Sequence, residues 1–63
     1  MRTHVKEMLV STIYVCDRWE TCIFSDETSE VVKYAFSEED AKSVHDEYVK
    51  MIEEDRFSFE DYH

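Results

Sequence analysis

The chain has 63 residues, and its 16 acidic and seven basic side chains give a formal net charge of −9 at pH 7. A chain of this length forms one domain, and folding buries only about 60% of the surface that its unfolded form exposes. The negative charge argues against direct binding to nucleic acid, because carboxylates and phosphates repel each other. The 43% of hydrophobic residues argues against a disordered acidic tail. We therefore expect a single small acidic domain over residues 1–63.

Glycine and proline are both absent from the sequence. This composition argues against a phosphate-binding glycine loop and against tight turns that need a positive φ. The N-terminal "MRTHVKEMLV" has no apolar run long enough for a signal peptide, and no later segment is long enough to span a bilayer. We expect a cytoplasmic protein with no membrane partner, whose thiols are reduced.

Three runs rich in β-branched and aromatic residues predict strands, at residues 8–16, 19–25 and 30–36. Polar residues that favour turns separate them, first Asp17-Arg18 and then residues 26–29. Short links between successive strands indicate an antiparallel meander.

The stretch "FSEEDAKSVHDEYVKMIEED", residues 36–55, predicts a helix. Its apolar residues recur at steps of three and four and form one stripe, consisting of Ala41, Val44, Tyr48, Met51 and Ile52. Ser37 is a suitable N-cap with Asp40 at the capping-box position, and we place the helix end near Glu54. The predicted fold class is α+β, a three-stranded antiparallel meander followed by one C-terminal helix (β-β-β-α).

Alternation along the strands predicts that both faces of the sheet are apolar. The first face carries Val10, Tyr14, Cys16, Trp19, Ile23, Val32, Tyr34 and Phe36. The second carries Leu9, Ile13, Val15, Cys22, Phe24, Val31 and Ala35, with Glu20 and Lys33 as polar members. One helix covers only one face, so the second needs a terminal segment, a second copy or another protein. We favour a homodimer, with a helical N-terminal segment folded over the sheet as the alternative.

The segment "CDRWETC", residues 16–22, sets two cysteines around the only tryptophan. An odd-numbered loop would place Cys16 and Cys22 on the same face, within reach of a disulfide. An even-numbered loop points them to opposite faces, and we expect this parity and free thiols. Trp19 then lies in the sheet, as a core or interface residue, and a four-residue loop over 17–20 would leave it more exposed.

The three histidines, His4, His45 and His63, have no metal-binding spacing, and we expect them to be exposed or half-exposed. Neither a zinc motif nor a nucleophile with a partnered base can be recognised, so no metal, cofactor or catalytic residue is predicted. Carboxylate pairs are abundant, but acid–base catalysis needs a pocket that so small a domain rarely encloses. The prediction is a protein that is not an enzyme.

The acidic side chains are more informative as a group. Glu38 with Lys42 and Asp46 with Lys50 have the i,i+4 spacing of ion pairs on a solvated helix face. The remaining acids lack such partners and extend from the helix start into the tail, residues 55–63, where Phe57, Phe59 and Tyr62 alternate with acids. Those aromatic residues either pack on the domain's own core or dock on a partner.

The function predicted from these features is a non-enzymatic acidic module that binds a basic protein surface by charge mimicry. The residues that we expect to bind the partner are Trp19, Glu38, Glu39, Asp40, Glu47, Glu53, Glu54, Asp55, Phe57 and Phe59. In size, charge and architecture the chain is similar to the small acidic proteins, DNA-mimic inhibitors among them, with which bacteriophages and mobile elements block host enzymes. The alternative is a small structural subunit of a larger assembly, whose charge serves only solubility.

Overall fold

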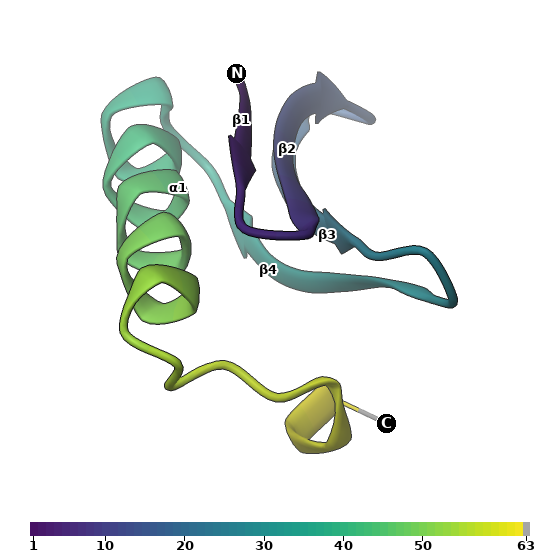
Figure 1. Cartoon of the computed structure of the whole chain (residues 1–63). Coiled ribbons are helices and arrows are strands. Elements are labelled where there is room, and N and C mark those ends of the chain that lie inside the picture. Colours follow the sequence, from purple (N-terminus) through teal and green to yellow (C-terminus); the bar gives the residue numbers. More distant parts are fainter. Residues whose placement is uncertain (63) are drawn as a thin grey trace.

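The computed structural model describes residues 1–62, which form a four-stranded antiparallel sheet and one long helix. The strands are β1 (Arg2–Val5), β2 (Met8–Val15), β3 (Arg18–Phe24) and β4 (Ser29–Ala35), in the spatial order β1-β2-β3-β4. Helix α1 (Glu38–Glu53) follows, and a 3₁₀ helix, η1 (Phe59–Tyr62), ends the described chain. Figure 1 shows α1 lying along one side of the sheet, with the tail running away from its end toward η1.

Strand β1 is absent from the three-strand prediction, and the suggested helical N-terminus is wrong. The strand pairs with β2 from Arg2 opposite Ser11 to Val5 opposite Met8. Residue Met1 extends the pairing, because its ammonium donates to the Thr12 carbonyl at 2.9 Å and its carbonyl accepts from the Thr12 amide at 2.8 Å. Sequence reasoning missed this strand because "RTHV" is short and mostly polar, and because its turn, Lys6-Glu7, contains no glycine.

The β2–β3 turn consists of only two residues, Cys16 and Asp17, since Val15 pairs with Arg18. Both have a positive φ, 54° and 62°, which is the requirement of a type I′ turn. The expectation that a chain without glycine avoids a tight pair is therefore wrong, and the turn lies one residue earlier than predicted. The prediction that this turn has an even number of residues is confirmed, and both cysteines are free thiols.

Helix α1 begins and ends at recognisable capping structures. Ser37 is the N-cap, as predicted, and its hydroxyl accepts from the Asp40 amide at 3.1 Å. At the other end Asp55 has φ 57°, and the amides of Asp55 and Arg56 donate to the carbonyls of Ile52 (3.1 Å) and Met51 (2.8 Å). This is the Schellman pattern, with aspartate in the left-handed position that glycine usually fills. It turns the chain sharply out of the helix direction.

The core lies between α1 and one face of the sheet. Its central cluster consists of Val5, Val10, Ile23, Tyr48 and Ile52, all buried. Partly buried side chains from the helix, the strands and the tail pack around it. The predicted helix stripe is confirmed with one change, because His45 is buried with Ala41, Tyr48 and Ile52, whereas Val44 and Met51 are half-buried.

A β-bulge alters the faces of β4. The register of β4 against β3 shifts between Thr21 and Cys22, so that Val32 has no direct partner. Beyond the bulge Ala35 lies opposite Trp19 on the helix side, and Tyr34 lies opposite Glu20 on the other side. The predicted faces of Tyr34 and Ala35 were therefore exchanged, because simple alternation does not include the extra residue.

The strained turn gives a stability prediction. Replacing Cys16-Asp17 by Asn-Gly, the preferred type I′ pair, is expected to stabilise the fold by about 1 kcal/mol, because left-handed backbone costs ordinary residues about that much each. In a domain of this size the melting temperature rises by roughly 4–8 °C, which thermal unfolding followed by circular dichroism measures.

The same dipeptide placed in the β3–β4 loop, by Asp26→Asn with Glu27→Gly, is the matched control. Neither residue has a positive φ there, so glycine adds only unfolded-state entropy and lowers stability. Equal shifts in the two variants would contradict the strain at Cys16 and Asp17.

Candidate protein-binding surfaces

The outward face of α1 carries carboxylates most of which have no counter-ion within residues 1–62. Pairs of acids stand at 39–40, 46–47 and 53–54, and all six side chains are exposed. The predicted ion pairs Glu38–Lys42 and Asp46–Lys50 do not form within residues 1–62. Of the six acids only Glu54 makes an ion pair in that range, with Arg56 at 2.7 Å. The negative charge of this face is therefore largely uncompensated.

These acidic pairs recur every seven residues. A helix rises 1.5 Å per residue and nearly repeats its orientation every two turns, so the three pairs stand about 10.5 Å apart along one side. Lys42 and Lys50 lie in the intervals between them. The face is thus a row of three negative positions separated by single positive ones.

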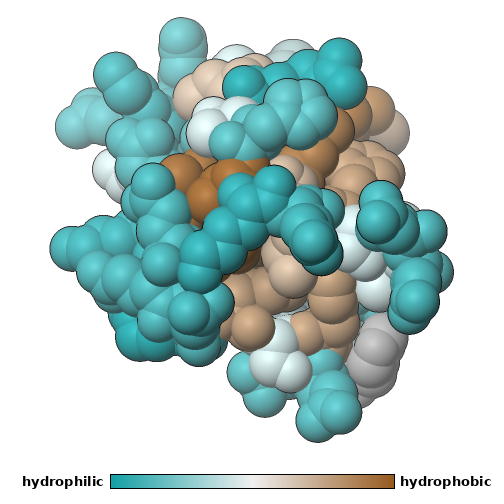
Figure 2. Space-filling model, in the orientation of Figure 1, coloured by the Kyte–Doolittle hydropathy of each residue, from teal (hydrophilic) through white to brown (hydrophobic). Residues whose placement is uncertain are grey.

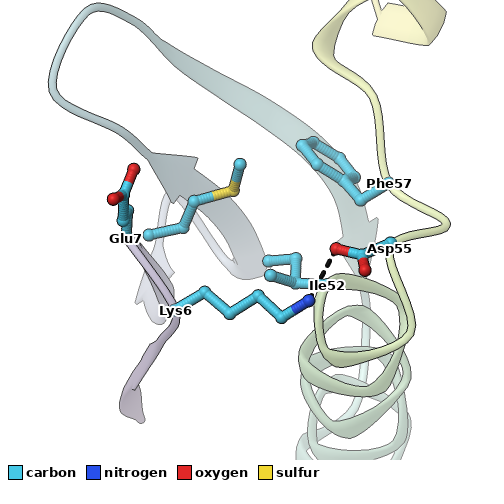
Figure 3. Close-up of a pocket in the computed structure, with 6 residues that line it drawn as sticks. Lys6, Glu7, Ile52, Asp55 and Phe57 are labelled. Carbon is cyan, nitrogen blue, oxygen red and sulfur yellow. Dashed lines mark hydrogen bonds and ion pairs between the residues drawn. The ribbon is translucent and has the colours of Figure 1, made fainter.

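At the C-terminal end of α1 a hollow of about 330 Å³ opens between the helix, the β1–β2 turn and the tail. It is lined by Lys6, Glu7, Met8, Ile52, Asp55 and Phe57. Figure 3 shows Lys6 reaching across from the turn to Asp55, with Ile52 and Phe57 on the helix and tail side. The Lys6 ammonium donates to the Asp55 carboxylate at 2.6 Å. Apolar side chains thus form the floor, and charged groups the rim.

The tail aromatics Phe57 and Phe59 are half-buried and are not free anchors. Phe57 packs edge-on against Tyr48 and stacks on Tyr62 at a ring separation of 5.6 Å. The hydroxyls of Tyr48 and Tyr62 form a hydrogen bond of 2.8 Å, and burial, followed by this bond, raises the pKa of Tyr48. Of the two predicted alternatives, packing on the domain's own core is confirmed for the described tail residues. His63 lies outside the described residues.

Trp19 lies at the opposite end of the molecule from the hollow. It is half-buried on the helix side of the sheet, and its ring meets that of Tyr14 edge-on at 5.2 Å. It pairs with Ala35, two residues before the N-cap of α1, so it lies at the end that carries Glu38, Glu39 and Asp40. The predicted binding residues therefore form two groups, one at each end of α1, with Glu47 between them.

The sheet face opposite α1 is open and partly apolar. Its exposed apolar side chains are Ile13 (51% exposed), Phe24 (41%), Val31 (41%) and Tyr34 (46%). Half-buried Leu9, Val15 and Cys22 lie among them. At one end the Arg18 guanidinium stacks over the Tyr34 ring at 4.2 Å and contacts Glu20 at 3.4 Å. The second apolar face predicted from alternation is present, although the bulge changes its members in β4.

A chain of hydrogen bonds crosses the core beneath α1. His45 Nε2 is bonded to Thr3 Oγ1 at 2.9 Å, and His45 Nδ1 to Thr12 Oγ1 at 2.8 Å. Thr12 is bonded in turn to Thr21 at 2.8 Å. The expectation of an exposed or half-exposed His45 is wrong, since only 3% of it is exposed. Burial, followed by the nearby N-terminal ammonium, lowers the pKa of His45, which favours the neutral ring.

A threonine hydroxyl hydrogen-bonded to a histidine ring could in principle serve as a nucleophile with its general base. Here both groups are buried, and no substrate can reach them. Thr12 and Thr21 are 1% and 2% exposed, and none of the described hollows is lined by them or by His45. The network instead satisfies buried polar groups and joins β1, β2, β3 and α1. Position 45 lies four residues after Ala41 and three before Tyr48, so the helix period itself could have identified the buried histidine.

Within residues 1–62 no group of three or more histidine, cysteine, aspartate or glutamate side chains could hold a metal ion. Cys16 is exposed at the hairpin tip, whereas burial raises the pKa of the Cys22 thiol and makes it less reactive. Of the described helices, none has the length and apolar character to cross a membrane. Figure 2 shows hydrophilic surface over α1 and apolar surface in the middle of this view, between the helix and the strands.

Comparisons of the chain with family models, with curated proteins and with solved structures found no match.

The buried imidazole gives a prediction on pH. The pKa of His45 is lowered in the folded state, so below about pH 6.5 the unfolded chain binds more protons than the folded one. The contribution of neutral His45 to stability is therefore complete above that pH and falls as the pH drops toward the folded pKa. The free energy of unfolding of the wild type, measured in urea at a series of pH values, should show this decline. In the His45→Gln variant the free energy of unfolding should depend less on pH over the same range.

His4→Gln is the matched control, because His4 is exposed on β1 and no hydrogen bond of its ring is found within residues 1–62. It should keep the decline of the wild type. An NMR titration of the His45 ring provides a second measurement, and a midpoint at or above the ordinary histidine value would refute the proposed burial effect.

Proposed function

We propose that this protein is a non-enzymatic acidic module that binds a basic surface of a protein partner. The observation that carries the proposal is the row of acidic pairs on α1, which is exposed and largely without counter-ions within residues 1–62. Uncompensated like charges repel one another and reduce stability, so a partner that supplies positive charge gains favourable energy at this face. The free thiols are compatible with a cytoplasmic setting.

The spacing of the pairs supports charge mimicry of nucleic acid. Each strand of a DNA duplex carries one phosphate per about 3.4 Å of helix axis, so the interval of about 10.5 Å between pairs matches the axial rise of roughly three nucleotides. A groove that binds the phosphates of nucleic acid presents Lys and Arg side chains, which such a row of carboxylates can also pair with. We propose that the module occupies the nucleic-acid-binding surface of a host protein and thereby inhibits it, as phage-encoded acidic inhibitors do.

We further propose that two copies pair through the open sheet face. The apolar side chains there are 41–51% exposed, and α1 and the tail pack on the other side. An isologous pair would bury the same side chains of both copies and leave both acidic helices facing outward, because α1 lies on the opposite side of the sheet. The same face also favours the second candidate function, a structural subunit of a larger assembly, in which the charge provides only solubility.

Affinity capture tests the binding function. A partner held through the acidic pairs should be captured at low salt and released as ionic strength rises, because exposed charges are screened. Asp46→Lys with Glu47→Lys reverses the central pair and should weaken capture by about tenfold at low salt. Glu60→Lys with Asp61→Lys changes the net charge equally in η1, outside the acidic row of α1, and should have a small effect.

Capture that is indifferent to salt, or equally weakened by the two double variants, would refute recognition by the row on α1.

Inhibition by mimicry is tested in a separate competition experiment. The captured protein should lose its nucleic acid in competition with the wild type and keep it with the Asp46→Lys, Glu47→Lys variant.

The proposed pairing is tested by the molar mass in solution. Ile13→Lys places a charge in the open face and should shift the wild-type dimer to monomer in sedimentation equilibrium, because a charge buried without a partner is costly. Phe36→Lys is the matched control, since Phe36 is 81% exposed and lies in the β4–α1 link outside that face. A wild type that stays monomeric at high concentration contradicts the dimer and leaves the open face to another protein.

A further inference from the structure

The hollow beside the helix end belongs to a larger depression around Glu7 and Met8. A second hollow, of about 190 Å³, lies between these two residues and Ser25, Asp26 and Glu27 of the β3–β4 loop. A third, of about 310 Å³, continues to Leu9 and Phe24 at the border of the open sheet face. Glu7 and Met8 line all three. The depression therefore runs from the end of α1 past Met8 to the β3–β4 loop.

The first hollow has room for an aliphatic side chain and an apolar floor against which it can pack. Its volume of about 330 Å³ is at the lower limit of small-molecule pockets, which run from about 300 to 1,000 Å³. Ile52 is buried at its base, and half-buried Met8 and Phe57 form its walls. A methionine wall adapts to the shape of an entering side chain. The surface therefore suits an anchor residue of a larger partner better than a free metabolite.

The charges around the depression determine which charge its ligand should carry. Lys6 is the cation on the rim, and its ion pair with Asp55 at 2.6 Å compensates its charge. Arg56 is likewise paired with Glu54. Glu7, Asp26 and Glu27 are exposed and make no ion pair within residues 1–62. The side of the depression next to the β3–β4 loop is thus negative, and the side next to Ile52 is apolar and nearly neutral.

We propose that this depression binds an extended basic segment of the partner protein, with one aliphatic side chain in the hollow over Ile52 and Phe57. Side chains two residues apart in an extended chain lie about 7 Å apart on one side, so a lysine or arginine two positions away from the anchor reaches Glu7, Asp26 or Glu27. The inference rests on the proposed function, because it names the partner segment that completes recognition by the acidic module. It adds an apolar anchor, which charge alone does not provide.

A blocked tetrapeptide, Lys-Leu-Lys-Lys, is the probe, and NMR of the intact protein is the measurement. The methyl signals of Met8 and Ile52 should shift on titration, together with the amide of Glu27. The peptide Lys-Ser-Lys-Lys has the same charge without the anchor and should bind about tenfold more weakly, because no aliphatic side chain leaves water. Glu7→Lys with Glu27→Lys should weaken both peptides by a similar factor and leave the fold intact, since both residues are exposed.

Equal affinity for the leucine and serine peptides, shifts confined to outward amides of α1, or no binding by either peptide would each overturn the depression as a site. None of these results affects the binding function assigned to α1, which is tested by Asp46→Lys with Glu47→Lys. Conversely, binding of the leucine peptide in the hollow, together with salt-indifferent capture of partners, would support the site and refute recognition by the acidic row. The experiments can therefore refute the acidic row on α1 and the depression around Met8 independently of each other.

Discussion

The rest of the structure depends on a shortage of covering surface, because a single helix has to close the apolar side of a four-stranded sheet. Helix α1 has 16 residues and is about 24 Å long, which suffices for one face only. The tail supplies further cover, since Phe57, Phe59 and Tyr62 pack on the core cluster. The Schellman turn at Asp55 makes this possible by directing the chain out of the helix axis. Within the described part of the chain, residues 1–62, no such cover reaches the opposite face, whose apolar side chains stay exposed.

The core that results is partly polar, which is unusual for so small a domain. His45, Thr12 and Thr21 are buried in it, at positions where apolar side chains would remove more hydrocarbon from water. Their hydrogen bonds hold β1, β2, β3 and α1 in one register, because each group would be costly if buried alone. A short polar strand such as β1 contributes little apolar area. Its attachment therefore relies on Thr3 and on the N-terminal ammonium as much as on Val5.

Local sequence signals predicted the helix and three of the strands well. The Ser37 cap and the helix period determine α1, and β-branched residues in alternation determine β2, β3 and β4. The features that failed depend on distant partners: β1 is a strand because β2 pairs with it, and the bulge at Val32 exchanges Tyr34 and Ala35. For the candidate site, the acidic residues of α1 could be listed from the sequence. The depression around Met8 could not, since its walls come from β2, α1, the β3–β4 loop and the tail.

The bulge in β4 also limits how this chain can change in evolution. Val32 is one extra residue, and removing it would restore simple alternation. The other residues of β4 would keep their partners and faces, with Val31 opposite Cys22, Lys33 opposite Thr21 and Ala35 toward the helix. A relative with a one-residue gap at Val32 should therefore keep the pattern of large and small side chains at 34–35 and of polar and apolar ones at 29–31. A gap placed elsewhere in β4 moves the residues between it and Val32 to the other face, and an alignment that shows it there has the wrong residues matched along this edge strand.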